Sequence, residues 1–251
     1  MLCILRPMDA VFPLSNGSKW NDNELRYTLR SLHQNFTPLN KIWIVGGHLP
    51  AWIKNARHLP FADPYRSSKD ANLITAIIIA CLEPDLSDDF LFMSDDQMLL
   101  RPLNPSDFRP YWVEDMQQIR NWGKSKWQMS LRSTYDHLSV EKLPTYNYEG
   151  HVPYIFNKHR FPRLMLNHDF GYGYGYTINT LYHNQFVDPE TYPDFKHLKV
   201  HNFRAGFFGN KAKHRIEDLE TKYFLAFDDA GLTPALKVKI QEKFPSPSPF
   251  E

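Results

Sequence analysis

The N-terminal part of the chain alternates between short apolar segments and longer segments with helical periodicity. The apolar segments lie at residues 8–15, 41–47 and 89–96. Between them, residues 24–36 place apolar side chains at helical spacing, and residues 67–83 are apolar nearly all round. Alternating strands and helices are typical of a mostly parallel sheet flanked by helices. We therefore expect an α/β fold.

Turn and capping residues predict where several of these elements begin and end. Pro13 is expected to end the first strand. Asp22 or Asn23 is the candidate N-cap of the helix that follows. Residues 50–56, PAWIKNA, favour a short helix, and Thr233 followed by a proline predicts the start of a C-terminal helix.

Length and charge limit the class of protein. A chain of 251 residues is within the range of one α/β domain, and a hydrophobic fraction of 42% allows a sizeable core. The formal net charge of +1, from 29 basic and 28 acidic residues, gives no overall attraction to nucleic acid or to membranes. A local basic and aromatic run at residues 120–132, RNWGKSKWQMSLR, leaves a nucleic-acid groove open as an alternative.

The sequence also indicates a cellular location. No apolar run reaches membrane-spanning length, and the N-terminus lacks the pattern of a secretory signal. Cys3 and Cys81 both lie in apolar runs, which favours buried reduced thiols over a disulfide. We therefore expect a soluble cytoplasmic protein with no membrane span.

Two adjacent carboxylates, Asp95 and Asp96, follow the apolar run FLFMS and precede a second one, QMLL. Ligands of open α/β sheets bind at the carboxyl ends of strands, and this pair lies at such an end. Two neighbouring carboxylates destabilise each other unless a positive charge lies near them. Oxygen ligands favour Mg²⁺ or Mn²⁺, and such a metal neutralises a leaving diphosphate. The alternative is a solvated turn after the strand.

Several motifs together resemble the Stealth family of sugar-phosphate transferases. The more specific ones are NELRYTLRSL (23–32), KIWIVGGHLPAWI (41–53), FLFMSDDQMLL (90–100) and, near the C-terminus, YFLAFDD (223–229) with FPSPSPFE (244–251). Two further regions of the family are similar to DAVFPLSNGS (9–18) and HVPYIFNK (151–158). The resemblance extends over almost the whole chain.

The resemblance implies a GT-A-like nucleotide-diphospho-sugar transferase fold in a single domain, 1–251. Residues 1–105 would form the nucleotide-sugar-binding half and residues 106–251 the acceptor side. It implies a metal-dependent enzyme that uses Mn²⁺ or Mg²⁺ and moves a sugar or sugar 1-phosphate from a UDP-sugar to a hydroxyl, with a glycan as the expected acceptor. Two alternatives stay open. One is a phage-type DNA glycosyltransferase acting on hydroxymethylated bases, and the other is a non-catalytic carbohydrate- or nucleotide-binding module.

When the family's motifs are carried onto this chain, its metal site falls on Asp95 and Asp96. Asp96 is expected to bind the metal directly, and Asp95 to hold the donor or the waters of the metal. His151, which opens HVPY, matches the family's catalytic histidine. It is expected to act as a general base or a phosphate ligand, with a structural hydrogen bond as the alternative.

Further residues are candidates for donor binding. Arg26 and Arg30 lie four residues apart on one helix face and retain positions of the family motif, with a surface ion pair as the alternative. Lys69 and Asn72 begin the helix that precedes the paired carboxylates. Because a helix N-terminus favours anions, Lys69 is expected at the diphosphate and Asn72 at a ribose or sugar hydroxyl. Plain capping is the alternative for both.

The last candidates lie late in the chain. His201 and Arg204 are candidates for a third metal ligand and a phosphate clamp. Asp228 and Asp229 form a second carboxylate pair, which favours either acceptor binding and catalysis or a turn before a glycine. Residues 171–176, GYGYGY, predict an aromatic lid over a sugar or base, or a surface strand with stacked tyrosines.

Overall fold

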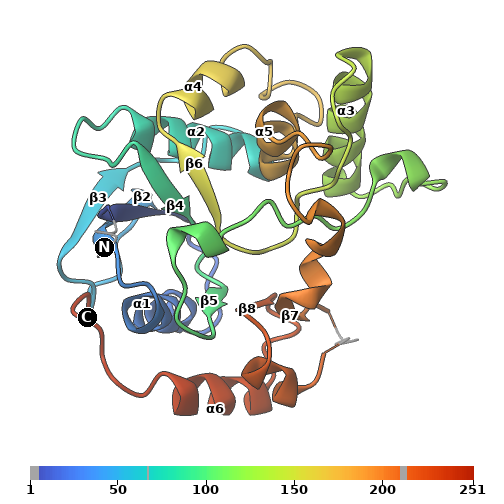
Figure 1. Ribbon diagram of the computed structural model, residues 1–251. Coiled ribbons are helices and arrows are strands. Elements are labelled where there is room, and N and C mark those ends of the chain that lie inside the picture. Colours follow the sequence, from blue (N-terminus) through green and yellow to red (C-terminus); the bar gives the residue numbers. More distant parts are fainter. Residues whose placement is uncertain (1–5, 67, 210–213) are drawn as a thin grey trace.

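The computed structural model describes residues 6–66, 68–209 and 214–251 (Figure 1). Its larger sheet has five strands in the order β3-β2-β1-β4-β6. These strands are β1 (Met8–Leu14), β2 (Leu39–Gly46), β3 (Ala56–Pro60), β4 (Asp89–Phe92) and β6 (Tyr154–Asn157). The first four run parallel to one another, and β6 runs antiparallel to β4. The expected mostly parallel α/β sheet is confirmed.

The chain continues from the larger sheet into a second, smaller sheet. This smaller sheet contains β5 (Gln97–Leu99), β8 (Phe224–Phe227) and β7 (Arg204–Phe207), in that order. β5 is antiparallel to β8, and β7 is parallel to it. The chain leaves β4 and enters β5 through residues 93–96, so the predicted carboxylate pair lies in the connection between the two sheets.

Helices cover both faces of the larger sheet (Figure 1). They are α1 (Asn23–Asn35), α2 (Lys69–Cys81), α3 (Lys126–Val140), α4 (Arg160–Met165), α5 (Ile178–Phe186) and α6 (Pro234–Lys243). In Figure 1, α2, α4 and α5 lie on one side of this sheet and α1 lies on the other, while α6 lies below the smaller sheet. Short 3-10 helices occupy Pro105–Asp107, Met116–Gln118, Phe195–His197, Val200–Asn202 and Ile216–Glu220.

The hydrophobic pattern of the sequence explains these layers. The central strand β1 buries Val11 and Phe12 completely, as expected for a strand covered on both faces. Leu25 and Leu29 of α1 are also fully buried, which follows from their helical spacing. A separate apolar cluster, including Leu236 of α6, packs the smaller sheet against that helix. The predicted N-cap Thr233 is confirmed, because its hydroxyl accepts a hydrogen bond from the backbone N–H of Leu236.

The first strand does not end at Pro13 as expected but continues to Leu14. Pro13 pairs with Val45 of β2 on one side. On the other side β4 pairs only with residues 9–11, so the missing N–H of Pro13 removes no ladder hydrogen bond there. Similarly, the strand predicted over residues 89–96 ends as β4 at Phe92, where the chain turns into the smaller sheet.

One further local prediction was wrong, and the N-cap prediction is right for the position of Asp22 but not for its side-chain bond. Residues 50–56 form no helix but a turn at residues 51–52 that leads into β3, an edge strand absent from the sequence-based outline. Asp22 precedes α1 with a left-handed φ of 56° and makes no side-chain capping bond. Instead, the Ser18 hydroxyl accepts from the backbone N–H of Asp22 and donates to the carboxylate of Glu24, which fixes the entry to α1.

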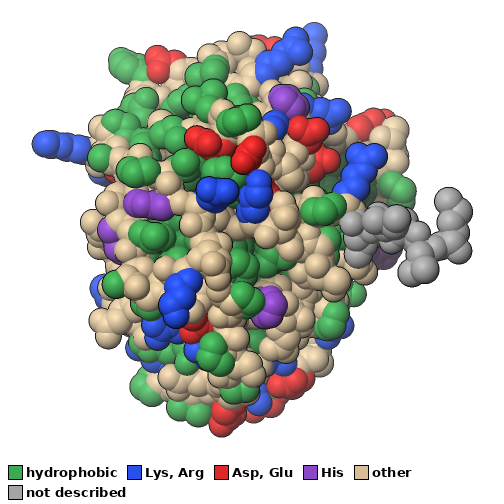
Figure 2. Space-filling view, turned by 90° about the vertical axis from the view of Figure 1, so that its left-hand side faces the viewer, with side chains coloured by type: hydrophobic (Ala, Val, Ile, Leu, Met, Phe, Trp, Pro, Cys, Tyr) green, Lys and Arg blue, Asp and Glu red, His purple; other side chains and the backbone are tan. Residues whose placement is uncertain are grey.

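The surface carries both signs of charge. On the face drawn in Figure 2, Lys and Arg side chains lie interspersed with Asp and Glu, in keeping with the near-neutral total. Among the described residues, every helix is too short or too polar to span a bilayer. Cys81 is a free thiol and is partly buried, while Cys3 lies outside the described residues.

Candidate functional site

The connection between the two sheets contains the acidic turn, residues 94–96. The backbone carbonyl of Asp95 accepts a hydrogen bond of 2.7 Å from the Thr28 hydroxyl on α1. The backbone N–H of Ser94 donates to the side-chain oxygen of Gln97 on β5, at 3.2 Å. Because α1 and β5 hold the turn from both sides, its carboxylates have a defined position beyond the end of β4.

One carboxylate oxygen of the acidic turn lacks a hydrogen-bond partner among the described residues, and the pKa values of both carboxyl groups are raised. Burial, and then the charge of Glu24, raises the pKa of Asp95 to about 6. Burial and then the charge of Asp95 raise the pKa of Asp96 to about 7, and the positive charge of Lys69 opposes both shifts. Oδ1 of Asp96 is buried and has no hydrogen-bond partner within the described part of the chain. An unsatisfied buried carboxylate beside a second one is suited to a cation.

The expected third metal ligand, His201, does not lie with this pair. His201 is largely exposed on its 3-10 helix. Its slight desolvation, and then the positive charges of Lys199 and Lys222, lower its pKa. Across residues 6–66, 68–209 and 214–251, no three His, Cys, Asp or Glu side chains lie close enough to hold one metal ion. Mg²⁺ commonly takes only one or two carboxylates and completes its shell with substrate phosphates and water. Asp95 and Asp96 therefore fit such an ion as a two-carboxylate anchor.

A histidine and an arginine lie close to each other beyond the same end of β4 as the acidic turn. Because β6 is antiparallel to β4, with Tyr154 opposite Phe92, the segment before β6 reaches the same end of β4 as the turn. His151 belongs to this segment, and its ring lies 4.9 Å from that of Phe208. The guanidinium of Arg204 also lies over the Phe208 ring, 4.9 Å from its centroid.

Arg204 has a nitrogen without a partner among the described residues, and His151 has a lowered pKa. Arg204 donates to the carbonyl oxygen of Gly150, while its buried Nε has no partner among the described residues. Burial lowers the pKa of Arg204 to about 10, so it stays positively charged at neutral pH. His151 is exposed to solvent on one side, and desolvation by the neighbouring protein, together with the charges of Arg204 and Lys69, lowers its pKa. This histidine is therefore neutral near pH 7 and able to accept a proton.

The remaining donor-binding candidates contact the protein itself. The side-chain amide of Asn72 pairs with the backbone N–H and C=O of Tyr65, both at 2.9 Å, and so closes the loop before α2. Arg30 forms two hydrogen bonds of 2.7 Å with the carboxylate of Glu251. Nε of Arg26 lies 3.4 Å from the same carboxylate. The ion-pair alternative thus describes both arginines in this structure.

The second carboxylate pair also has structural partners. Asp228 accepts hydrogen bonds from the backbone N–H groups of Gly209, at 2.9 Å, and Gly231, at 2.7 Å, and so holds the turn after β8. Asp229 forms an exposed ion pair of 3.0 Å with Lys19. The turn alternative describes this pair, and the two side chains act in the structure as connectors between loops.

The sequence analysis missed two carboxyl groups near the same region. Burial and the charge of Glu149 raise the pKa of Asp70, at the start of α2, to about 7. Glu149 accepts hydrogen bonds from the side-chain amide of Asn179, at 2.9 Å, and the backbone N–H of Thr180, at 2.8 Å. The available signal was sequence proximity, because Asp70 follows Lys69 and Glu149 lies two residues before the HVPY motif.

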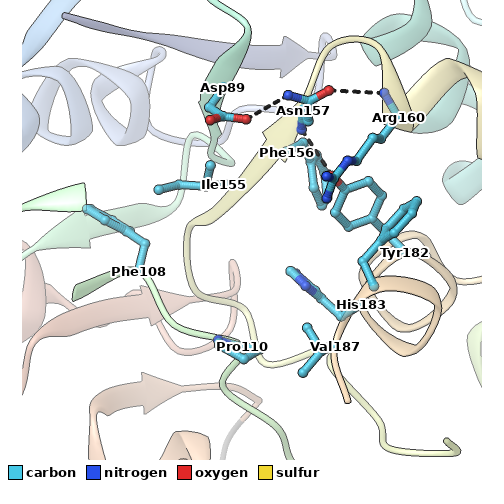
Figure 3. Close-up of a pocket in the computed structure, with 11 residues that line it drawn as sticks. Asp89, Phe108, Pro110, Ile155, Phe156, Asn157, Arg160, Tyr182, His183 and Val187 are labelled. Carbon is cyan, nitrogen blue, oxygen red and sulfur yellow. Dashed lines mark hydrogen bonds between the residues drawn. The ribbon is translucent and has the colours of Figure 1, made fainter. Parts of the chain in front are cut away.

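A cavity of about 380 Å³ lies at the other end of β4 (Figure 3). Asp89 and Asn157, the paired ends of β4 and β6, border it, together with Phe108, Arg160 and His183. The side-chain amide of Asn157 donates to Asp89 at 2.8 Å, as drawn in Figure 3. Because this cavity is at the amino end of β4, it is separate from the acidic turn.

Comparison with known proteins yields one curated relative and several solved structures. No protein-family model matches the chain. An exopolysaccharide phosphotransferase of Streptomyces coelicolor is 32% identical over 94 residues, which cover 34% of this chain and 16% of that protein. Two structures of the galactosyltransferase LgtC, one with donor and acceptor sugar analogs and one of an active-site mutant, are 10% and 12% identical. Each alignment covers 97% of this chain and 98% of the other, with TM-scores of 0.47 and 0.48.

Proposed function

We propose that this protein is a metal-dependent transferase that moves a sugar or sugar 1-phosphate from a UDP-sugar to a hydroxyl acceptor on a glycan. One observation carries the proposal. The acidic turn presents two carboxylates with raised pKa, and a buried oxygen of Asp96 has no partner among the described residues; the charge of Lys69 acts on both groups. A nucleoside diphosphate with a divalent metal supplies the charges that this arrangement lacks.

Each side chain has a role in this proposal. Asp96 and Asp95 would hold Mn²⁺ or Mg²⁺, which neutralises the diphosphate when bound. Lys69 and Arg204 would bind phosphate oxygens as negative charge develops on the leaving nucleotide. His151, neutral because its pKa is lowered, is suited to donate a hydrogen bond to a phosphate or to accept a proton.

The curated relative supports the same class of chemistry. Its name describes a phosphotransferase that acts on exopolysaccharide, and the matched segment is 32% identical to this chain. Transfer of a sugar 1-phosphate to a glycan is therefore one form of the proposed reaction, and transfer of the sugar alone is the other.

Calorimetric titration of UDP with and without Mn²⁺ tests the metal site. We expect wild-type protein to bind UDP only with the metal, and Asp96→Asn to weaken that binding by roughly 100-fold, because a direct ligand is lost. Asp88→Asn is the matched control, since Asp88 is an exposed carboxylate paired with Lys158 at 3.7 Å. Equal metal-independent binding of UDP by wild type and Asp96→Asn would contradict the site.

Donor hydrolysis then identifies the reaction. UDP-glucose, UDP-galactose and UDP-N-acetylglucosamine are incubated with the protein and Mn²⁺, and the nucleotide product is separated by chromatography. Release of UDP means glycosyl transfer, because the sugar leaves at its anomeric carbon. Release of UMP means sugar-phosphate transfer, because the diphosphate bond breaks. Metal-dependent UDP binding without either product would favour a binding module over an enzyme.

A further inference from the structure

The cavity at the amino end of β4 has the size and the lining of a small-molecule site (Figure 3). We call it the amino-end cavity. Its volume of about 380 Å³ falls within the usual range of ligand pockets, roughly 300–1,000 Å³. A surface rich in aromatic and aliphatic groups favours a ligand with a flat apolar body. Such groups line the cavity at Phe108, Pro110, Ile155, Phe156, Phe186 and Val187.

The amino-end cavity has a buried floor and an exposed rim. Phe156 is completely buried and His183 is 7% exposed, and their ring centroids lie 6.0 Å apart. By contrast, Phe186 is 41% exposed, and Arg160 is also an exposed residue. A ligand therefore enters beside Phe186 and Arg160 and meets His183 last.

Asn157 ties the walls of the cavity together. Its side-chain amide donates to the Asp89 carboxylate at 2.8 Å, which holds that carboxylate against Asn157 (Figure 3). Its side-chain oxygen accepts from the backbone N–H of Arg160 at 3.1 Å, and its own backbone N–H donates to the Tyr182 hydroxyl at 3.1 Å. These bonds connect β4, β6, α4 and α5, so the cavity keeps its shape before any ligand binds.

Arg160 supplies a positive charge at the rim. The two basic residues before it, Lys158 and His159, lie 3.7 and 3.2 Å from the carboxylate of Asp88. The Arg160 guanidinium pairs with no carboxylate in the described parts of the chain, and it lies over the Phe186 ring at 5.5 Å from the centroid. An arginine without such a partner favours a carboxylate ligand, which it can bind through two parallel hydrogen bonds.

His183 supplies a polar atom at the floor. In Figure 3 its ring extends from α5 towards the middle of the lining residues. Nε2 of His183 is buried and has no hydrogen-bond partner within residues 6–66, 68–209 and 214–251. Aromatic rings surround the imidazole, with Tyr154 at 4.7 Å and Tyr148 at 5.1 Å, and burial lowers the pKa of His183 to about 3. The ring is therefore neutral at pH 7, and a hydroxyl group, which can donate or accept, satisfies its free nitrogen.

We propose that the amino-end cavity is a binding site for a small aromatic carboxylate with a hydroxyl group at the far end of its ring. The ring lies between the apolar walls, the carboxylate pairs with Arg160, and the hydroxyl forms a hydrogen bond with His183. A sugar fits this lining less well, because most of its hydroxyls would meet apolar side chains and lose their hydrogen bonds to water. The site is independent of the acidic turn and of the proposed transfer reaction.

Saturation-transfer NMR on the whole protein tests the site with 4-hydroxybenzoate, 4-hydroxyphenylacetate and 4-hydroxycinnamate. EDTA is present throughout, so that the result does not depend on the proposed metal site. We expect at least one acid to bind, and we expect Val187→Trp, which fills the cavity from its wall, to abolish the signal with an unchanged circular dichroism spectrum. Val238→Trp, at an exposed valine of α6, is the matched control and should bind as wild type. Signal from none of the acids, or signal that survives Val187→Trp, would overturn the proposal.

Titration of the acid that binds best then tests the charge at the rim. We expect Arg160→Gln to raise its dissociation constant about tenfold, because a charge-assisted pair is lost. Arg163→Gln, at an exposed arginine of the same helix that does not line the cavity, should leave it unchanged. The corresponding alcohol, which lacks the carboxylate, should bind wild type about tenfold more weakly than the acid. Equal binding of acid and alcohol, or tighter binding of glucose than of the acid, would overturn the ligand class.

The substitution His183→Phe tests the contact at the floor. It keeps an aromatic ring among the neighbouring rings and removes the unpartnered nitrogen. Wild type should bind the hydroxylated acid about fivefold more tightly than the same acid without its hydroxyl, and His183→Phe should bind the two equally. A preference for the hydroxyl that is absent from wild type, or that persists in His183→Phe, would overturn the role of His183.

Discussion

Asp96 carries a buried carboxylate oxygen without a partner in the described residues, next to the second carboxylate of Asp95. Burial and this neighbour raise the pKa of Asp96 to about 7. The unfolded chain loses its proton near the ordinary value of 3.8, so ionisation costs more in the folded state. Proteins keep such unfavourable groups at functional sites, where a ligand compensates them.

Removal of this charge should therefore stabilise the ligand-free protein. In EDTA at pH 8, we expect Asp96→Asn to raise the free energy of unfolding by about 1–3 kcal/mol, because the neutral amide avoids the cost of ionisation. At pH 4 the carboxyl is protonated in the folded state, and the gain should disappear. Urea denaturation at both pH values measures this. Asp88→Asn should change stability by less than about 0.5 kcal/mol at both, and a gain for Asp96→Asn that is independent of pH would contradict the explanation.

At the scale of elements, the C-terminal segment braces the helix that supports the acidic turn. Arg30 of α1 binds the Glu251 carboxylate with two hydrogen bonds of 2.7 Å, and Lys54 donates its backbone N–H to the carbonyl of Phe250 at 2.8 Å. The same helix holds the turn through Thr28. The FPSPSPFE motif thus holds α1 in position.

The substitution Glu251→Gln should weaken this brace. It removes the charge-assisted pair with Arg30, and we expect the free energy of unfolding to fall by about 1.5–3 kcal/mol. Glu242→Gln, at an exposed carboxylate of α6, is the matched control and should have little effect. Chemical denaturation at pH 7 compares the two, and equal stability of both variants would show that the pair adds nothing.

At the scale of the whole molecule, the acidic turn is the shortest of the chain connections between the two sheets. β4 ends three residues before Asp95, and β5 begins directly after Asp96. A ligand that binds this turn contacts groups held by both sheets and binds the folded state alone. Its binding free energy therefore adds to the stability of the complete fold.

UDP with Mn²⁺ should raise the melting temperature of the protein. At 100 times the dissociation constant, the expected stabilisation is about 2.7 kcal/mol. UMP is the control ligand, because it lacks the second phosphate, and EDTA should reverse the shift. Thermal denaturation of wild type and Asp96→Asn measures it. An equal shift by UMP, or a shift that persists in EDTA, would count against a diphosphate bound through a metal.

Local patterns predicted much of the fold. The order of the first three buried strands and the two helices between them follows from periodicity, and Thr233 caps its helix as expected. The edge strand β3 escaped prediction, because a short, half-exposed segment such as residues 56–60 has a weak pattern of its own. The antiparallel β6 also escaped it, since strand direction depends on a partner far along the chain.

The sequence by itself determined the paired carboxylates and their place after a buried strand, because both depend on neighbouring residues. Only the tertiary structure decided which side chains join them. Antiparallel pairing of β6 places His151 at the same end of β4, and α5 brings the backbone N–H of Thr180 to the carboxylate of Glu149. The tertiary structure also places His201 away from the paired carboxylates, and it pairs the Asp228 carboxylate with backbone N–H groups. These contacts join residues tens of positions apart, and packing of the whole chain selects them.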